Sequence, residues 1–357
     1  MIVHEWFTET TSVVDRGAEF GARWSSQLQH ARDDYLRLFI QSGVPEAAAR
    51  RTAKECFDAV AALAPEIAEE YRGMARGSGL PLPDLHLLAA RTEILAGVTT
   101  SQECSTIVHV PHDARAPHTL QTWDWHQTLS NETIVQQFRS STGSRITTFC
   151  EFGQPAKIGV NEHGVGLHFN ILHHESDGSR VGVPVHVLAR MILDRARTLE
   201  DAVSIARSTP LAASTVLTVV SFDGTTPRAA AIEVSPVGIA VLPVDRGSTF
   251  AHTNHFLDAA LAAGEHCPYE TSSHPRYRCL TDAAALAEIA DDRDRALAFG
   301  AIPAAPISVR PVPEEPEHLR WETKLTIALD VAAGAIAFAP AAPADIQQSQ
   351  WRRVGAE

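Results

Sequence analysis

The feature that most constrains the fold is a change of residue pattern close to residue 100. Before it, apolar residues such as Leu28, Tyr35 and Leu38 recur at helical spacing, and the Ala-rich stretch 45–70 contains few helix breakers. From Cys104 onward the chain is dominated by β-branched and aromatic runs that are typical of strands. We therefore expect a helical N-terminal segment followed by a β-rich remainder.

The strand-like runs come in groups that are separated by helical segments. We expect strands over 105–110, 132–138, 145–152, 156–160, 164–171, 214–221, 229–234, 238–244, 324–331 and 335–338. Further helices are expected over 85–96, 184–207 and 281–299, with a Gly-rich turn at 73–81 and a Pro-rich linker at 303–316. Because strands follow one another in groups, the order favours an α+β fold, with helices layered on sheets, over a doubly wound parallel sheet.

Composition excludes several classes of protein. The chain has 30 Lys+Arg against 43 Asp+Glu, a net charge of −13, and so lacks the basic surface that nucleic acid requires. No apolar run is long enough to cross a membrane, and the first residues do not follow the pattern of a secretory signal. Five widely spaced cysteines favour reduced thiols. We expect a cytoplasmic protein that binds neither nucleic acid nor membranes.

Generic catalytic motifs are missing from the sequence. It has no G-x-S-x-G, no P-loop and no complete dinucleotide fingerprint. Histidines gather near the middle of the chain, so a zinc hydrolase is one alternative; they are His126, His163, His168, His173 and His174. However, there is no H-E-x-x-H or C-x-x-C, and adjacent histidines on a strand point to opposite faces. Hydrogen-bonded or solvated histidines are the more common case, and we expect neither a metal nor an organic cofactor.

Cys104 stands at the junction between the two patterns. A helical segment ends near Gly97, the polar stretch 99–103 follows, and the cysteine opens the first expected strand. A cysteine in such a place is usually a small buried hydrophobe, but a nucleophile is the alternative. The residues alone leave both interpretations open.

Further motifs accompany this cysteine in a fixed order. They are GMARGSG at 73–79, ARTE at 90–93, CST at 104–106, TWDW at 122–125, KIGVNEHGVG at 157–166, HFNILH at 168–173, GVP at 182–184, HTNH at 252–255 and ISVR at 307–310. Each motif is weak alone. In this order and spacing the chain resembles, over most of its length, the isopenicillin-N acyltransferase family of N-terminal nucleophile hydrolases.

The resemblance implies a four-layer αββα sandwich that is made as an inactive precursor and cuts its own chain. The cut bond would be Glu103–Cys104, giving a helical chain of residues 1–103 and a catalytic chain of residues 104–357 that stay together as a heterodimer. The fungal pattern has Gly before the cysteine where this chain has Glu103. Since Gly tolerates strained dihedral angles that Glu does not, this departure bears on the cleavage rate. Any higher oligomer is left open.

The resemblance also assigns chemistry to the new N-terminus. A free α-amino group titrates near ~7.7–8 and a thiol near ~8.5, so the amine of Cys104 is matched to accept its own thiol proton. One residue would then supply both nucleophile and base, and a thioacyl-enzyme would form.

Three more residues match catalytic positions of the family. Asp124 would orient the ammonium group or assist self-cleavage, and the side-chain NH₂ of Asn254 would donate to the oxyanion. Arg310 would hold Asp124 or the tetrahedral intermediate by paired hydrogen bonds. Their ordinary alternatives are a turn aspartate, a turn asparagine and a surface arginine. We also expect Asn170 and His173 to line a substrate pocket.

The function expected from this resemblance is hydrolysis of a small N-acyl amine or amide. The C-terminal VGAE is not a peroxisomal address, and the net charge of −13 does little to attract an acyl-CoA thioester. An acyl-CoA-dependent N-acyltransferase is the first alternative. A catalytically inactive family member that serves as a binding protein is the second.

Overall fold

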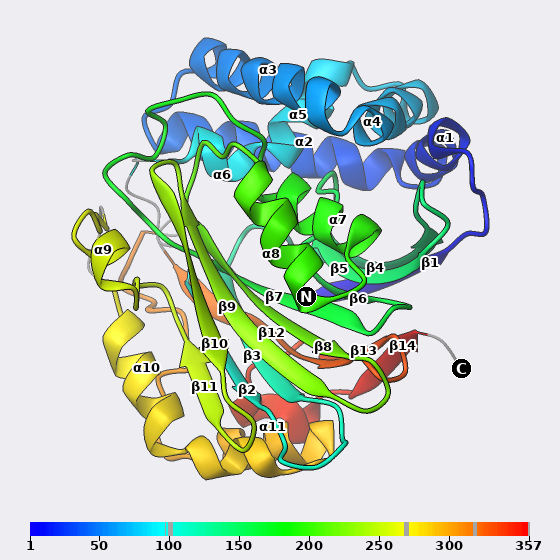
Figure 1. The fold of residues 1–357 in the computed structure, drawn as a ribbon. Coiled ribbons are helices and arrows are strands. Elements are labelled where there is room, and N and C mark those ends of the chain that lie inside the picture. The colour runs from blue at the N-terminus through cyan, green and yellow to red at the C-terminus, as the bar shows by residue number, and fades with distance from the viewer. Residues whose placement is uncertain (97, 99–102, 268–270, 317–319, 356–357) are drawn as a thin grey trace.

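The computed structural model describes residues 1–96, 98, 103–267, 271–316 and 320–355. At its centre two β-sheets face each other (Figure 1). Within the described residues, one sheet has the order β1-β4-β5-β6-β7-β8-β9-β10 and the other the order β11-β2-β3-β12-β13-β14. The strands of the first sheet are Ile2–Phe7, Glu132–Arg139, Arg145–Glu151, Ile158–Asn161, Val165–Ile171, Thr215–Phe222, Pro227–Ser235 and Gly238–Val244. Those of the second are Thr249–His252, Glu103–His109, His118–His126, Trp321–Asp330, Ala335–Ala339 and Arg352–Gly355.

Helices cover the outer faces of both sheets. The pair α7 and α8, Val185–Arg195 and Leu199–Ser208, packs on β6 to β9 of the first sheet. On the second sheet, α10 contacts β11 and β2, while α11 contacts β3; these helices are Ser273–Asp282 and Asp292–Gly300. The result is the helix, sheet, sheet, helix order of a four-layer sandwich. The expected α+β, four-layer fold is confirmed.

The N-terminal helices form a further group at the top of Figure 1. They are α1 to α6, with bounds Val13–Arg23, Ser25–Gln41, Glu46–Leu63, Pro65–Ser78, Leu82–Ala89 and Arg91–Ile94; α9 is the short helix Ala259–Ala262. The helix expected over 45–70 is interrupted at Ala64, because Pro65 opens a new helix. The segment is also not purely helical, because β1 pairs in parallel with β4.

Most of the segment 73–81, which we expected to be a Gly-rich turn, is the last part of helix α4, and α4 packs closely against α1. Helix α4 runs through Gly73 and Gly77 and ends only at Gly79, which has a φ of +73°. A Cβ on Gly73 would lie 2.1 Å from the carbonyl oxygen of Val14, and one on Gly77 would lie 2.0 Å from that of Ala18. These glycines therefore allow α4 to approach α1, and the prediction of a turn that begins at residue 73 is wrong.

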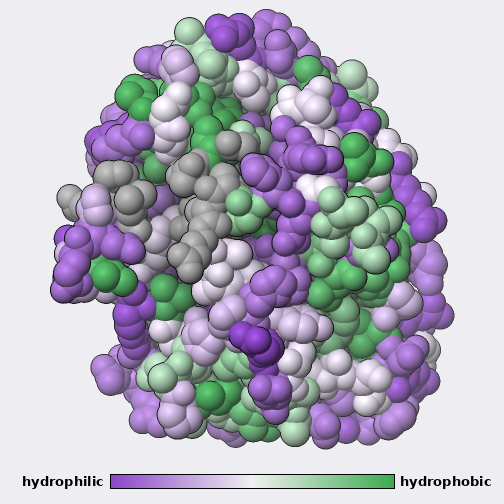
Figure 2. All heavy atoms as spheres, turned by 90° about the vertical axis from the view of Figure 1, so that its left-hand side faces the viewer, coloured by the Kyte–Doolittle hydropathy of each residue, from purple (hydrophilic) through white to green (hydrophobic). Residues whose placement is uncertain are grey.

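The strand predictions succeed where strands are covered on both faces. All but the last residue of β8 are buried, since helices lie on one side and the second sheet on the other. Such strands contain continuous apolar runs. The described helices include none that is both long and apolar enough to cross a bilayer. On the face shown in Figure 2, hydrophilic residues surround hydrophobic patches of limited size.

Candidate active site

Cys104 is the second residue of β2, at the end of the sandwich where that strand begins. Its Cα pairs with that of Trp123 on β3, so the two side chains lie on the same face of the sheet. That face is the inner one, because two residues later Thr106 donates to Asn170 of the opposite sheet at 2.7 Å. Cys104 is buried, with 4% of its surface exposed.

The backbone of Cys104 is held on both sides by polar side chains. Its N–H donates to Asn254 Oδ1 at 2.8 Å, and its carbonyl accepts from Arg276 Nη1 at 2.5 Å. A second guanidinium nitrogen, Nη2, donates to the same Asn254 oxygen at 2.9 Å. Since two donors meet at Oδ1, the orientation of the carboxamide is fixed by its partners.

Asn254 is itself anchored in the loop that follows β11. Its backbone N–H donates to Ser273 Oγ at 2.7 Å, and its Nδ2 donates to the carbonyl of Ile171 at 2.8 Å. In the intact chain, therefore, the carboxamide oxygen orients the nitrogen of Cys104. The expected donation from its NH₂ group to an oxyanion stays a prediction.

Glu103, the residue before the nucleophile, lies in extended conformation on β2 and pairs with Asp124. One carboxylate oxygen accepts from Thr271 Oγ1 at 2.9 Å and from the N–H of Ser272 at 3.0 Å, and the other lies 3.3 Å from Arg276 Nη2. Burial raises the pKa of this carboxyl group, but Arg276 and the hydroxyl donors outweigh it, so the pKa lies below its ordinary value. The structure thus accommodates a side chain here without positive φ.

Asp124 is buried on β3, beside Glu103. Its Oδ1 accepts from Thr323 Oγ1 at 2.6 Å, whereas Oδ2 has no hydrogen-bond partner among the residues that the structure describes. Burial raises the pKa of this carboxyl group to about 7, although Arg276 and Thr323 act to lower it. A group with such a pKa is able to take up or release a proton near neutral pH.

The thiol of Cys104 is strongly affected by its surroundings. Burial raises its pKa to about 12, and Asp124 adds to this, whereas Lys157 and Arg276 lower it. A backbone hydrogen bond from Asp124 also favours the thiolate. Forming the thiolate in the intact chain therefore requires either a nearby base or additional positive charge.

The arginine of the site is Arg276 and not Arg310. The Arg310 guanidinium is 55% exposed and pairs with Asp345, so the structure does not bring it to Asp124. Arg276 was not identified as a site residue from the sequence, although its spacing from other residues of α10 is a signal that could have indicated it. The buried residues of α10 are Ser273, Arg276 and Leu280, which places an arginine on the inward-facing stripe of that helix.

Asn170 and His173 occupy different places. Asn170 lies between the two sheets, where its Oδ1 accepts from Thr106 and, at 3.2 Å, from Gln121 Nε2; it joins the sheets behind Cys104. His173 is buried close enough to Glu103 to interact with its charge, and burial lowers the pKa of the imidazole to about 4. Their lining of a substrate pocket stays a prediction.

The central histidines do not assemble into a metal site. His168 contacts Gln121 Oε1 at 3.0 Å, His163 contacts Ser144 Oγ at 2.8 Å, and His174 contacts Ser176 Oγ at 2.8 Å. Over the described ranges no three His, Cys, Asp or Glu side chains are grouped so as to hold a metal ion.

Comparison with known sequences finds a matching family. The family described as acyl-coenzyme A:6-aminopenicillanic acid acyl-transferase matches residues 113–288. A curated relative from Emericella nidulans, the acyl-coenzyme A:6-aminopenicillanic-acid-acyltransferase 40 kDa form, is 29% identical over 197 residues, which are 54% of this chain and 52% of the relative. The chain thus spans about half the length of the curated relative that it matches.

Comparison with solved structures gives distant similarities. Penicillin V acylase from Agrobacterium tumefaciens is 16% identical with a TM-score of 0.39, covering 67% of this chain and 83% of that one. The Caenorhabditis elegans orthologue of N-acylethanolamine-hydrolyzing acid amidase is 15% identical with a TM-score of 0.44, covering 71% and 100%. A mutant of conjugated bile acid hydrolase from Clostridium perfringens is 10% identical with a TM-score of 0.47, covering 71% and 92%.

Proposed function

We propose that this chain, which belongs to the acyl-coenzyme A:6-aminopenicillanic acid acyl-transferase family, is a self-processing amidohydrolase with Cys104 as its N-terminal nucleophile. The observation that carries the proposal is the clamp on Cys104. Asn254 Oδ1 lies 2.8 Å from the Cys104 nitrogen, which self-cleavage would turn into an amine. Arg276 donates to the carbonyl oxygen of Cys104 itself. Every buried backbone N–H and C=O needs a partner, but here polar side chains from two other segments supply both.

Self-cleavage would begin with attack of the Cys104 sulfur on the carbonyl carbon of Glu103. The sulfur gives up its proton, the Glu103–Cys104 C–N bond breaks, and the proton passes to the leaving nitrogen, which becomes the amine of Cys104. Water then hydrolyses the thioester and leaves a carboxylate on Glu103. Asp124, with a pKa of about 7, is the group beside this bond best suited to move the proton. Its second oxygen accepts no hydrogen bond from the described residues.

In turnover the freed amine of Cys104 would take the thiol proton while the sulfur attacks the carbonyl of an acyl amide. The tetrahedral intermediate collapses as its nitrogen takes the proton and leaves as an amine, and a thioacyl-enzyme remains. Water then releases the acid and restores the thiol. Asn254 Oδ1 would orient the amine, and its NH₂ group would donate to the oxyanion. This route uses no metal and no organic cofactor.

The proposed substrate is a small N-acyl amine or amide. Water is the simplest acceptor for the thioacyl group, because transfer to an amine requires a site that holds the amine and excludes water. Acyl-CoA-dependent N-acyltransfer is the second candidate, and the name of the curated relative is the observation that favours it. The third candidate is a catalytically inactive family member that serves as a binding protein. For all three we propose a cytoplasmic location.

The decisive experiment is an intact-mass spectrum of freshly purified protein. We expect two chains, residues 1–103 and residues 104–357, that co-elute as a heterodimer. Full-length protein alone after long incubation would contradict self-processing and favour the binding protein. The processed protein would then be incubated with acyl amides, including β-alanyl and phenylacetyl amides, and separately with acyl-CoA and amine acceptors. Clean transfer from acyl-CoA without amide hydrolysis would replace the hydrolase by the acyltransferase.

A further inference from the structure

Lys157 is a buried lysine in the layer between the sheets, immediately before β6. Its Nζ lies 4.0 Å from the centre of the Trp123 ring. Trp123 is the cross-strand neighbour of Cys104, with its side chain on the same face of the sheet. The ammonium group of Lys157 therefore lies in the same part of the core as the thiol. Its side chain is only 3% exposed, so water does not screen its charge.

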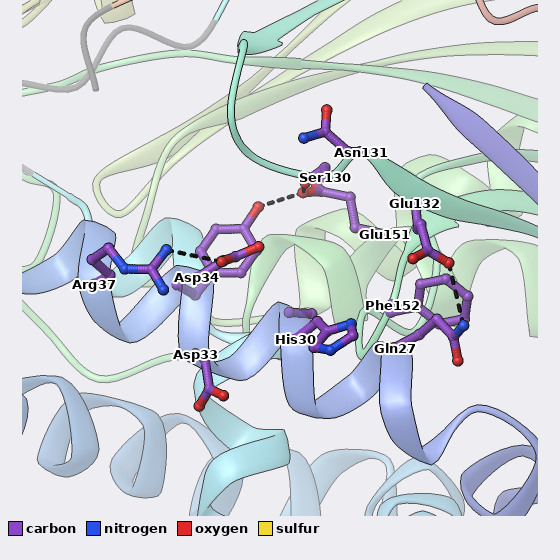
Figure 3. A pocket seen from close by; sticks show the side chains of 12 residues that line it. Gln27, His30, Asp33, Asp34, Arg37, Ser130, Asn131, Glu132, Glu151 and Phe152 are labelled. Atoms are coloured by element: carbon purple, nitrogen blue, oxygen red, sulfur yellow. Dashed lines mark hydrogen bonds and ion pairs between the residues drawn. The ribbon is translucent and has the colours of Figure 1, made fainter. Parts of the chain in front are cut away.

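The carboxylate nearest to Lys157 is already satisfied by other donors. Glu151 lies 3.5 Å from Lys157 Nζ but accepts from Arg91 Nη2 at 2.7 Å and from Gln154 Nε2 at 2.9 Å. The hydroxyl groups of Tyr35 and Ser130 donate to its other oxygen. Figure 3 shows Glu151 and Ser130 together at the wall of a pocket of about 300 Å³ beside α2. Lys157 is thus a second cation next to a carboxylate that Arg91 already neutralises.

The charges around this lysine leave a positive excess on the side of Cys104. The pKa of Lys157 is affected by the charges of Glu151, Arg91 and Cys104. The charge of Lys157 in turn lowers the pKa values of His186 on α7 and Cys150 on β5. Both His186 and Cys150 are neutral because burial lowers the pKa of the first and raises that of the second to about 12. Two cations therefore face one carboxylate.

Besides Lys157, the ionisable side chains of Arg276 and Asp124 act on Cys104, and that of Glu93 acts on Arg91. Arg276 lies 3.3 Å from Glu103, which balances its charge, and burial raises the pKa of Asp124 to about 7. Glu93, which acts on Arg91, also has its pKa raised to about 7 by burial. Of the charged side chains that act on the thiol, Lys157 lowers its pKa most strongly. Burial lowers the pKa of Lys157 to about 8, and Arg91 adds to this, whereas Glu151 and Cys104 raise it. Keeping an ammonium group in such a core is unfavourable, so a functional reason for it is expected.

We propose that Lys157 is a positioning residue for the nucleophile: its ammonium group stabilises the thiolate of Cys104 at the moment of attack. This inference rests on the proposed role of Cys104 and adds a residue to it. The effect applies to both steps, self-cleavage and turnover, because the same sulfur attacks in each. When the thiolate forms, the excess positive charge on Lys157 gains the counter-charge that Glu151 does not supply.

The test is the rate at which iodoacetamide alkylates Cys104, followed by the mass of the peptide that contains it. The rate is measured at pH 6 to 8, because burial lowers the pKa of Lys157 to about 8 and its amine must stay charged. For Lys157→Met we expect at least a tenfold slower rate, because removing the charge raises the thiol pKa by at least about one unit. Lys157→Arg keeps the charge and is expected to recover most of the rate. Alkylation requires neither cleavage nor hydrolysis, so its outcome is independent of whether the proposed function holds.

Lys324→Met is the matched control. Lys324 is also a buried lysine, but it bonds to the Gln127 carbonyl at 3.0 Å and to Asn131 Oδ1 at 2.9 Å, and its charge is not among those that act on Cys104. A folded Lys157→Met protein alkylated at the unaltered rate would overturn the proposal. So would an equal loss in the two Met variants, which would indicate a merely structural effect. Failure to label Cys104 in the unaltered protein up to pH 8 would also overturn it.

Discussion

Replacing Arg276 by methionine should affect this site most severely, because one buried guanidinium group serves several partners. It donates to the Cys104 carbonyl, to Ser105 Oγ at 3.1 Å, to Asn254 Oδ1 at 2.9 Å and to Ser272 Oγ at 2.9 Å. Methionine retains most of the apolar stem but none of these donors. The variant would also leave Glu103 without its positive neighbour.

The size of the effect follows from these contacts. A hydrogen bond from a charged donor contributes roughly 1.5–3 kcal/mol, but the contacts share one side chain and are not additive. Removing one partner of a buried ion pair costs about 3–5 kcal/mol. We therefore expect Arg276→Met to lower the free energy of unfolding by about 3–5 kcal/mol. We also expect it to prevent cleavage, because the Cys104 carbonyl loses its donor and Asn254 Oδ1, which orients the nitrogen, loses the second donor that fixes it.

Urea unfolding measures the loss in a Cys104→Ala background, which keeps the chain in one piece. Arg310→Met is the matched control, because it removes an arginine whose pair with Asp345 is half exposed and worth about 0–1 kcal/mol. Intact mass of the same substitutions in the unaltered background reports cleavage. An Arg276→Met protein that loses less than about 1 kcal/mol and still cuts itself would refute this account of the site.

Three further outcomes are expected at neighbouring residues. Cys104→Ala should stay in one piece and be inactive by mass and turnover, while Cys104→Ser should cut more slowly; cleavage in the alanine variant would exclude the sulfur as nucleophile. Asn254→Ala should lower kcat by roughly 10²–10³ with little change in KM, and a change confined to KM would contradict an oxyanion role. The raised pKa of Asp124 means that the folded chain keeps a proton which the unfolded chain loses, so stability should fall between about pH 4 and 7. At about 1.4 kcal/mol per pKa unit, Asp124→Asn should remove up to roughly 4 kcal/mol of that fall in thermal unfolding scans, and an unchanged slope would contradict the assignment.

The fold was largely predictable because its central strands are covered on both faces. Continuous apolar runs mark strands such as β8, and both β7 and β8 lie within a residue of their expected bounds. The strand β3 was missed because buried polar residues interrupt it. Gln121, for example, is satisfied by the Phe169 carbonyl at 2.7 Å, a partner that only the opposite sheet supplies. The missed strands β11 and β14 have four residues each, which is too few for a clear pattern. In β1 the two buried residues, Val3 and Trp6, are three apart and do not alternate.

The site was predictable only where a residue belongs to a motif. Cys104, Asp124 and Asn254 do, and the structure brings them together. Arg276 lies in a polar helix between Pro275 and Tyr277, and its proximity to Cys104 depends on how α10 packs on β2. Conversely, Arg310 belongs to a motif, yet its side chain reaches Asp345 instead. The stripe of Ser273, Arg276 and Leu280 on α10 marks an inward-facing arginine, but long-range packing decides that it reaches Cys104.

The pairing of β1 with β4 has a consequence for the self-cleavage that we propose. Residues 1–103 supply a whole edge strand, in register from Ile2 opposite Glu132 to Phe7 opposite Gln137, together with α1 to α6. After a cut before Cys104 the two chains would stay associated through this pairing. Once unfolded, however, they would have to reassociate in solution before they could refold. The larger piece alone would expose the unpaired edge of β4, which invites aggregation. If the chain cuts itself as we propose, folding therefore has to precede the cut, and a cut molecule that has been denatured and diluted is not expected to recover its native state.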